Sequence, residues 1–180
     1  MIVRIIAGSL GGCKIDAPDR TSTHAMSERA RNALFNSIGR AINGQRVLDA
    51  FAGSGSLGIE ALSRGASEAV FVERDRIACK IIAKNLTSLN LEDRSVLIRT
   101  TVSNWLDTAQ AEPFDIIFAD PPYSDPQFST VKRLFALLKP GALMVLSHSG
   151  KGEVPIQDGI VVVDNRSYGN LHLTFFRLDA

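Results

Sequence analysis

The segment best suited to chemistry is Asp120-Pro-Pro-Tyr123, an acid followed by two prolines and an aromatic ring. Because proline has no backbone N–H, the carbonyl groups of Pro121 and Pro122 lie in a stretch that accepts hydrogen bonds. This array suits a planar group with an exocyclic amine, which would donate to Asp120 and the Pro121 carbonyl while Tyr123 stacks on the ring. Such bonding would draw the nitrogen lone pair out of conjugation and point it at an electrophile.

A second group of residues has the pattern of a nucleotide-binding turn. Gly53, Gly55 and Gly58 have G-x-G-x-x-G spacing after an apolar run, which allows a tight turn and close packing of a helix on a strand. Asp49 lies at the end of that run, where its carboxylate is expected to point into the crevice. Glu73 ends the next apolar run, in position to accept hydrogen bonds from ribose hydroxyls.

Two classes of cofactor are compatible with this order of elements, dinucleotides and S-adenosylmethionine (SAM). A pyrophosphate binds free backbone N–H groups at the N-terminus of a helix, and a carboxylate as close as Asp49 would repel it. The same carboxylate would attract the ammonium and sulfonium charges of SAM. The electrostatic argument therefore favours SAM.

The elements that must position these residues alternate between strands and helices. Five apolar runs predict parallel strands at residues 46–50, 69–73, 95–99, 114–119 and 142–146. Helical periodicity and capping residues predict helices at 57–63, from Asp75 to about 89, around 104–108 and at 127–138. Two further strands, 159–164 and 170–178, are joined by a turn at 165–169 and should pair antiparallel. The pattern is typical of a doubly wound α/β sheet, with ligands beyond the carboxyl ends of the strands.

The N-terminal residues predict a separate small element. Residues 2–7 and 14–17 read as a β-hairpin, and a helix is expected from the N-cap Ser27 to Ile38. Arg31 falls on the apolar side of this helix, so it must either snorkel or reach a polar site beneath the helix.

Composition places the chain among single-domain globular proteins. Its 180 residues are 45% hydrophobic, and no apolar run is long enough to span a membrane. The two cysteines, Cys13 and Cys79, are far apart and lack metal-ligand spacing, as expected for reduced thiols of a cytoplasmic protein. Residues 1–46 contain seven Lys or Arg and three acids, an excess that suggests a polyanionic partner or merely a solvated surface.

Taken together, these motifs resemble one family. Asp49 with its glycine loop, Glu73 and Asp120–Tyr123 are similar to the class I SAM-dependent amino-methyltransferases, which act on DNA adenine, protein glutamine or nucleic-acid guanine N2. The segments 4–8, 27–36 and 49–65 further resemble the bacterial RsmD family, which methylates guanine N2 in 16S ribosomal RNA. The resemblance spans nearly the whole chain.

The resemblance implies a Rossmann-like class I methyltransferase fold, with a seven-stranded, mostly parallel sheet and an antiparallel C-terminal hairpin. Residues 1–45 would be an RNA-binding extension and residues 46–180 the SAM-binding catalytic core of one domain. It also implies ribosomal RNA in a partly assembled small ribosomal subunit as the partner, and a cytoplasmic monomer that uses neither a metal nor a membrane.

By position, the resemblance implies a role for each motif residue. The residues that would hold SAM are Asp49, Ala52, Gly53, Ser54, Gly55, Glu73, Arg74 and Val102. Those that would receive the flipped guanine are Asp120, Pro121, Pro122 and Tyr123, and those that would contact RNA are Lys14, Arg29 and Arg31. The chain departs from the family pattern at His24-Ala25-Met26, where Arg-Pro-Thr is usual, and at Thr101, where an acid or amide is usual.

Other functions remain compatible with parts of the sequence. A DNA adenine or protein glutamine methyltransferase would share the acceptor array, although a chain of this length has little room for a DNA target-recognition domain. A dinucleotide-dependent oxidoreductase would use the glycine loop and Glu73 but leaves Asp120–Tyr123 unexplained. A non-catalytic RNA-binding module would have no use for an acceptor array.

Overall fold

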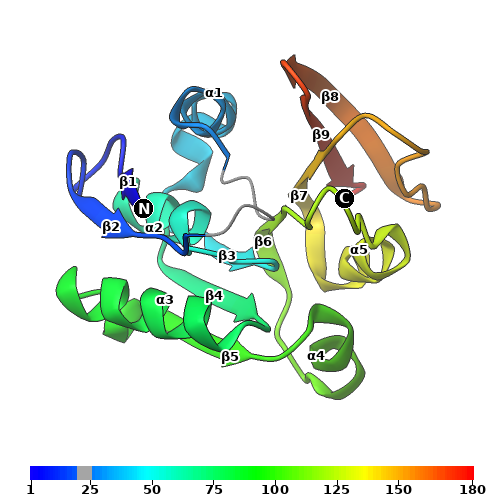
Figure 1. Cartoon of the computed structure of the whole chain (residues 1–180). Coiled ribbons are helices and arrows are strands. Elements are labelled where there is room, and N and C mark those ends of the chain that lie inside the picture. The colour runs from blue at the N-terminus through cyan, green and yellow to red at the C-terminus, as the bar shows by residue number, and fades with distance from the viewer. Residues whose placement is uncertain (20–25) are drawn as a thin grey trace.

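The computed structural model describes residues 1–19 and 26–180. A seven-stranded sheet in the order β5-β4-β3-β6-β7-β9-β8 forms the centre of the molecule (Figure 1). The strands are β3 Arg46–Asp49, β4 Glu68–Glu73, β5 Ser95–Arg99, β6 Phe114–Ala119, β7 Leu138–His148, β8 Ile160–Tyr168 and β9 Leu171–Leu178. The first five are parallel, whereas β9 pairs antiparallel with both β7 and β8. This topology confirms the fold class predicted from the sequence.

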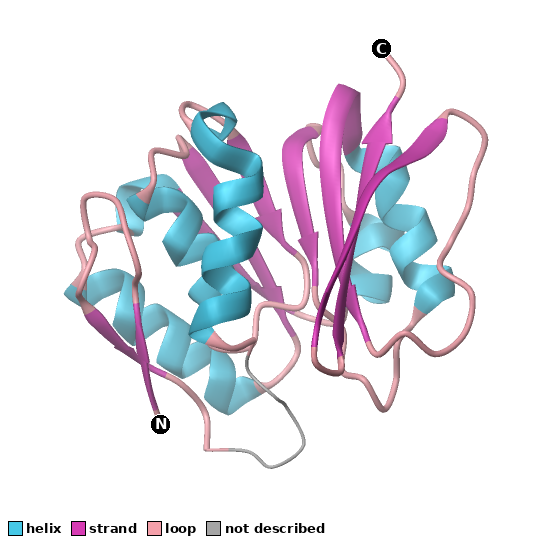
Figure 2. Ribbon diagram, turned by 90° about the horizontal axis from the view of Figure 1, so that it is seen from above, coloured by secondary structure: helices cyan, strands magenta, loops and turns pink. Residues whose placement is uncertain are grey.

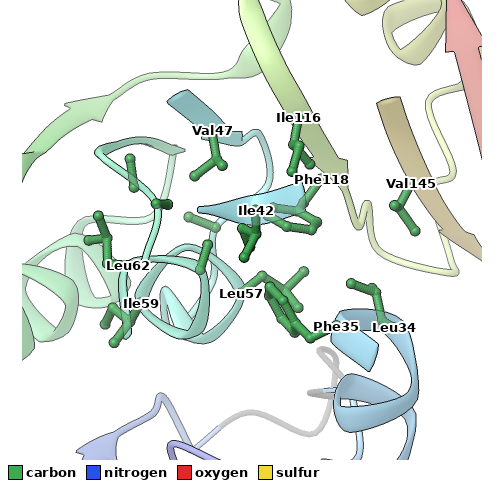
Figure 3. Close-up of a cluster of buried hydrophobic side chains, with 14 of the residues drawn as sticks. Leu34, Phe35, Ile42, Val47, Leu57, Ile59, Leu62, Ile116, Phe118 and Val145 are labelled. Atoms are coloured by element: carbon green, nitrogen blue, oxygen red, sulfur yellow. The ribbon is translucent and has the colours of Figure 1, made fainter. Parts of the chain in front are cut away.

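Helices cover both faces of the sheet, as Figure 2 shows from above. The helices are α1 Glu28–Ile38, α2 Ser56–Ser63, α3 Arg76–Ser88, α4 Val102–Thr108 and α5 Phe128–Leu134, with short 3-10 segments at Gly39–Ile42, Glu92–Arg94 and Phe135–Leu137. Alternate residues of each strand point to opposite faces, so Val47 joins one hydrophobic cluster and Leu48 the other. The first cluster packs α1, α2 and α3 against the sheet (Figure 3), and the second packs α4 and α5.

The N-terminal hairpin is formed by β1 Ile2–Arg4 and β2 Lys14–Asp16, and it docks on α2. Two buried side chains of α2 hold it there. Glu60 accepts hydrogen bonds from the backbone N–H groups of Ile6 at 2.9 Å and Ala7 at 3.1 Å, and Ser63 accepts one from Leu10. Helix α1 follows as predicted, with Ser27 capping its N-terminus through the Ala30 N–H.

Three details of the predicted elements were wrong. Helix α5 ends at Leu134, and Lys139-Pro-Gly141 lies within β7, because a bulge in the register with β6 accommodates the proline. Strand β8 extends to Tyr168, so the predicted turn at 165–169 shrinks to Gly169 and Asn170. The helical periodicity of residues 75–89 predicts Ile77 on the apolar stripe of α3, but Ile77 is 59% exposed and the buried stripe starts at Ala78.

Candidate active site

A cavity of about 1080 Å³ lies beyond the carboxyl ends of the parallel strands. Residues that directly follow each of β3 to β7 line it, as expected for a ligand site in an open α/β sheet. Six of the eight residues predicted to bind a cofactor are on its wall, namely Ala52, Gly53, Ser54, Glu73, Arg74 and Val102. All four residues of Asp120–Tyr123 line the same cavity. Its volume is at the upper end for small-molecule sites, so it has room for a nucleoside cofactor and a second planar group.

The glycine loop between β3 and α2 forms one side of this cavity. Gly53 and Gly55 have φ angles of +58° and +81°, in the left-handed region that favours glycine. Gly58 meets a different constraint, since a Cβ atom there would lie 2.3 Å from a ring carbon of Phe71. The loop is therefore shaped by two turn glycines and one packing glycine, as the spacing predicted.

Glu73 ties the loop to the end of β4. Its Oε2 accepts a hydrogen bond from the Gly53 N–H at 2.7 Å, and its Oε1 accepts one from the Asp75 N–H at 3.0 Å. A carboxylate oxygen has two lone pairs, so each keeps one for a further donor from the cavity. The side chain is thus fixed in position while it can still accept from ligand hydroxyls.

Asp49 is buried behind the residues that line the cavity, and the direction of its carboxylate stays a prediction. The side chain is 1% exposed, and its Oδ2 accepts a hydrogen bond from the Gly58 N–H at 2.9 Å. Its Oδ1 is buried without a hydrogen-bond partner among the described residues. Burial raises the pKa of Asp49 well above its usual range, and the nearby charges of Asp120 and Glu73 raise it further. Gly55, also predicted to bind cofactor, lies likewise behind the lining residues.

These observations fit SAM better than a dinucleotide. An unpartnered acceptor on a buried carboxylate fits a cationic donor. The N–H groups of Gly53 and Gly58 are already bonded to carboxylates, so they are not free to bind a pyrophosphate. The residues that would hold SAM are the glycine loop with Asp49 behind it, and Glu73, Arg74 and Val102 beside it.

The acceptor array follows β6, the strand that pairs with β3, and it includes a residue that the sequence analysis missed. Ser147, at the end of β7, is 2% exposed and lies 3.4 Å from the Tyr123 hydroxyl. Its hydroxyl also bonds the Asp120 side chain. Burial raises the pKa of Asp120 to about 6, although the hydrogen bond from Ser147 opposes the rise. At neutral pH the carboxylate is ionised and can accept hydrogen bonds from an amine.

Several lining residues come from segments to which no role was predicted. Ser149 and Lys151 follow β7, and Asn170 lies in the β8–β9 turn. Their only signal in the sequence is their position just after a buried strand or in a turn. Thr101 also lines the cavity, and its hydroxyl caps α4 by accepting from the Asn104 N–H.

The three residues predicted to contact RNA lie outside the cavity lining and differ in exposure. Lys14 and Arg29 are exposed, as RNA contact requires. Arg31 is 1% exposed, donates a hydrogen bond to the Arg4 carbonyl at 2.7 Å and lies 3.7 Å from Glu60. The RNA role predicted for Arg31 is therefore wrong, because the side chain serves a polar site beneath the helix. His24 and Ala25 lie outside the described residues.

Two features are absent from the residues that the structure describes. No helix there is both long and apolar enough to cross a membrane. No group of three or more His, Cys, Asp or Glu residues in that part of the chain is arranged to hold a metal ion.

The sheet order and the paired motifs of the cavity define a class I methyltransferase fold. The family model described as conserved hypothetical protein 95 matches residues 3–177. The ribosomal RNA small subunit methyltransferase D of Haemophilus influenzae is 35% identical over 150 residues, covering 79% of this chain and 76% of that protein. The Escherichia coli protein of the same name is 37% identical over 121 residues, covering 67% of this chain and 60% of that protein.

Solved structures agree with this match. The Thermus thermophilus protein TTHA0928 is 32% identical, with a TM-score of 0.82 and 99% of both chains covered. The Escherichia coli protein yhhF, for which methyltransferase activity has been proposed, has a TM-score of 0.90 at 28% identity and covers 100% of this chain and 99% of its own. The chain belongs to the RsmD family.

Proposed function

We propose that this chain transfers a methyl group from SAM to the exocyclic N2 of a guanine in 16S ribosomal RNA. The observation that carries the proposal is that Asp120–Tyr123 and the glycine loop line one cavity. A planar amine held by the first would therefore lie beside a cofactor held by the second. The names of the curated relatives support ribosomal RNA of the small subunit as the substrate.

The acceptor array would orient the target amine. Asp120 and the Pro121 carbonyl accept its two N–H bonds, and Tyr123 stacks on the base, with its hydroxyl held near Ser147 at 3.4 Å. When bound, SAM supplies a methyl group that is already activated on a positive sulfur. The protein therefore contributes mainly positioning, and the proton released from N2 leaves through the hydrogen bond to Asp120.

The proposed substrate is ribosomal RNA in a partly assembled small subunit. The target base must leave its stack to enter the cavity, which a partly assembled small subunit in the cytoplasm allows more readily than a finished one. Residues 1–45 would be the extension that contacts RNA, through the exposed Lys14 and Arg29. DNA adenine and protein glutamine, which would suit the same array, receive no support from the names of the relatives.

The test is methyl transfer from labelled SAM to small ribosomal subunits from a bacterial strain that lacks the corresponding gene. Free 16S RNA, DNA and subunits from the parent strain are assayed alongside, and the products are hydrolysed to nucleosides. We expect labelled N2-methylguanosine from the deficient subunits only. Labelled N6-methyladenine in DNA, or a labelled protein, would overturn the proposed substrate.

A further inference from the structure

Two of the described cations of the N-terminal extension already have acidic partners within the protein. Arg4 forms an ion pair with Glu28, and the buried Arg31 faces Glu60. Lys84 of α3 similarly pairs with Asp16 of β2 at 2.7 Å. A charge that is already paired gains less from a phosphate, because the existing partner must be released first. The positive excess of this segment therefore overstates its capacity to bind RNA.

The rim of the cavity has the opposite character. Arg76, the first residue of α3, and Lys151, in the loop after β7, are exposed and line the cavity mouth. Neither forms an ion pair with any residue of 1–19 or 26–180. Arg76 also lies in the first turn of its helix, where the macrodipole disfavours a cation. Its charge is thus not explained by the stability of α3.

The sheet order places these two cations on opposite sides of the acceptor array. Arg76 follows β4 and Lys151 follows β7, and these strands are separated by β3 and β6. Three inter-strand spacings correspond to about 14 Å. Asp120 follows β6, between them. A nucleotide whose base enters the cavity at Asp120 would therefore direct its two flanking phosphates towards the two rims.

We propose that Arg76 and Lys151 form a clamp for the phosphates on the two sides of the flipped nucleotide. The partner is single-stranded RNA, read by charge and spacing rather than by sequence. This inference rests on the proposed function, because it takes RNA as the substrate. It assigns the main phosphate contacts near the reaction to the cavity rim rather than to the N-terminal extension.

The test compares Arg76→Gln, Lys151→Gln and the double variant with wild type in methyl transfer to gene-deficient small subunits. Lys80→Gln on α3 and Lys132→Gln on α5 are matched controls, because both side chains are exposed and lie outside the cavity lining. kcat/KM is measured over a series of salt concentrations, and SAM affinity is measured by calorimetry.

We expect each rim substitution to reduce the slope of log kcat/KM against log salt by about 0.7, and the double variant to reduce it by about 1.4. SAM affinity should not change, and the two control variants should keep the wild-type slope. An unchanged slope in the double variant, or an equal change in the controls, would overturn the clamp. So would weaker SAM binding in Arg76→Gln, because the arginine would then serve the cofactor.

Direct binding of a single-stranded RNA oligonucleotide over the same salt series separates this inference from the proposed function. If wild type transfers no methyl group to ribosomal RNA, the proposed function fails. The clamp would still be supported if the double variant reduced the slope of log binding constant against log salt. An unchanged slope would refute it.

Discussion

The two sides of the cavity are built in different ways. On the glycine-loop side, backbone N–H groups of Gly53 and Gly58 are held by the carboxylates of Glu73 and Asp49, at 2.7 and 2.9 Å. On the acceptor side, the described contact between Tyr123 and Ser147 joins two side-chain hydroxyls at 3.4 Å. The hydrogen bonds of the glycine-loop side thus belong to the folded framework. The acceptor side consists of side chains at the ends of strands.

This difference predicts different consequences of mutation. Changes on the glycine-loop side should affect stability and cofactor binding together, because the same hydrogen bonds serve both. Changes on the acceptor side should alter methyl transfer while leaving the fold intact. The comparison can be tested by single substitutions on each side.

The largest effect is expected for Asp120→Asn on the acceptor side. The amide has nearly the shape of the carboxylate but carries no charge, so it accepts the target N–H more weakly. Methyl transfer should fall by roughly 100- to 1000-fold, by analogy with the removal of one preorganised polar group from an active site. Single-turnover transfer and SAM calorimetry measure the two properties separately. A variant within tenfold of wild type would show that Asp120 does not hold the amine.

A smaller effect, on stability, is expected for Gly58→Ala on the glycine-loop side. The added Cβ would lie 2.3 Å from the Phe71 ring, and such overpacking reduces the free energy of unfolding by about 1–3 kcal/mol. Urea denaturation measures the loss, and SAM affinity should fall with it. Phe71→Leu provides the control, because Gly58→Ala should destabilise less in that background. Equal losses in both backgrounds would contradict the packing role.

The smallest effect is expected for Ser147→Ala, as a shift in pH dependence. The pKa of Asp120 is raised to about 6, so transfer should decline as the pH falls through 6 and the carboxylate becomes protonated. Removing the Ser147 hydrogen bond, which lowers this pKa, should move the midpoint upwards by up to about one pH unit. The midpoint is measured from the rate of methyl transfer between pH 5 and pH 8, in wild type and in Ser147→Ala. An unchanged midpoint would mean that Ser147 only fills space.

Local patterns in the sequence predicted the framework well. Each of these patterns is local in the sequence. They are the glycine spacing, the helix caps at Ser27 and Asp75, and the apolar runs that form strands. These signals were sufficient to predict the sheet and a ligand site beyond the carboxyl ends of its strands. The predicted roles of these residues remain predictions that the experiments above address.

Three of the failures, at Arg31, Ser147 and Lys139-Pro-Gly141, share one cause, which is that they depend on residues distant in sequence. The position of Arg31 on an apolar face was evident, but its partner Glu60 is on another helix. Ser147 joined the site only through the pairing of β7 with β6, and the same pairing drew Lys139-Pro-Gly141 into a bulged strand. Periodicity describes an element by itself and cannot show which distant side chain will face it.

The buried Glu60 has a consequence for the order in which the chain folds during synthesis. Its backbone partner Ile6 precedes it by 54 residues, and the whole hairpin leaves the ribosome before α2 has been made. Contacts this distant in sequence form late, because a long segment of chain must first be ordered. Residues 2–16 are therefore synthesised well before the α2 residues that hold them in the native fold.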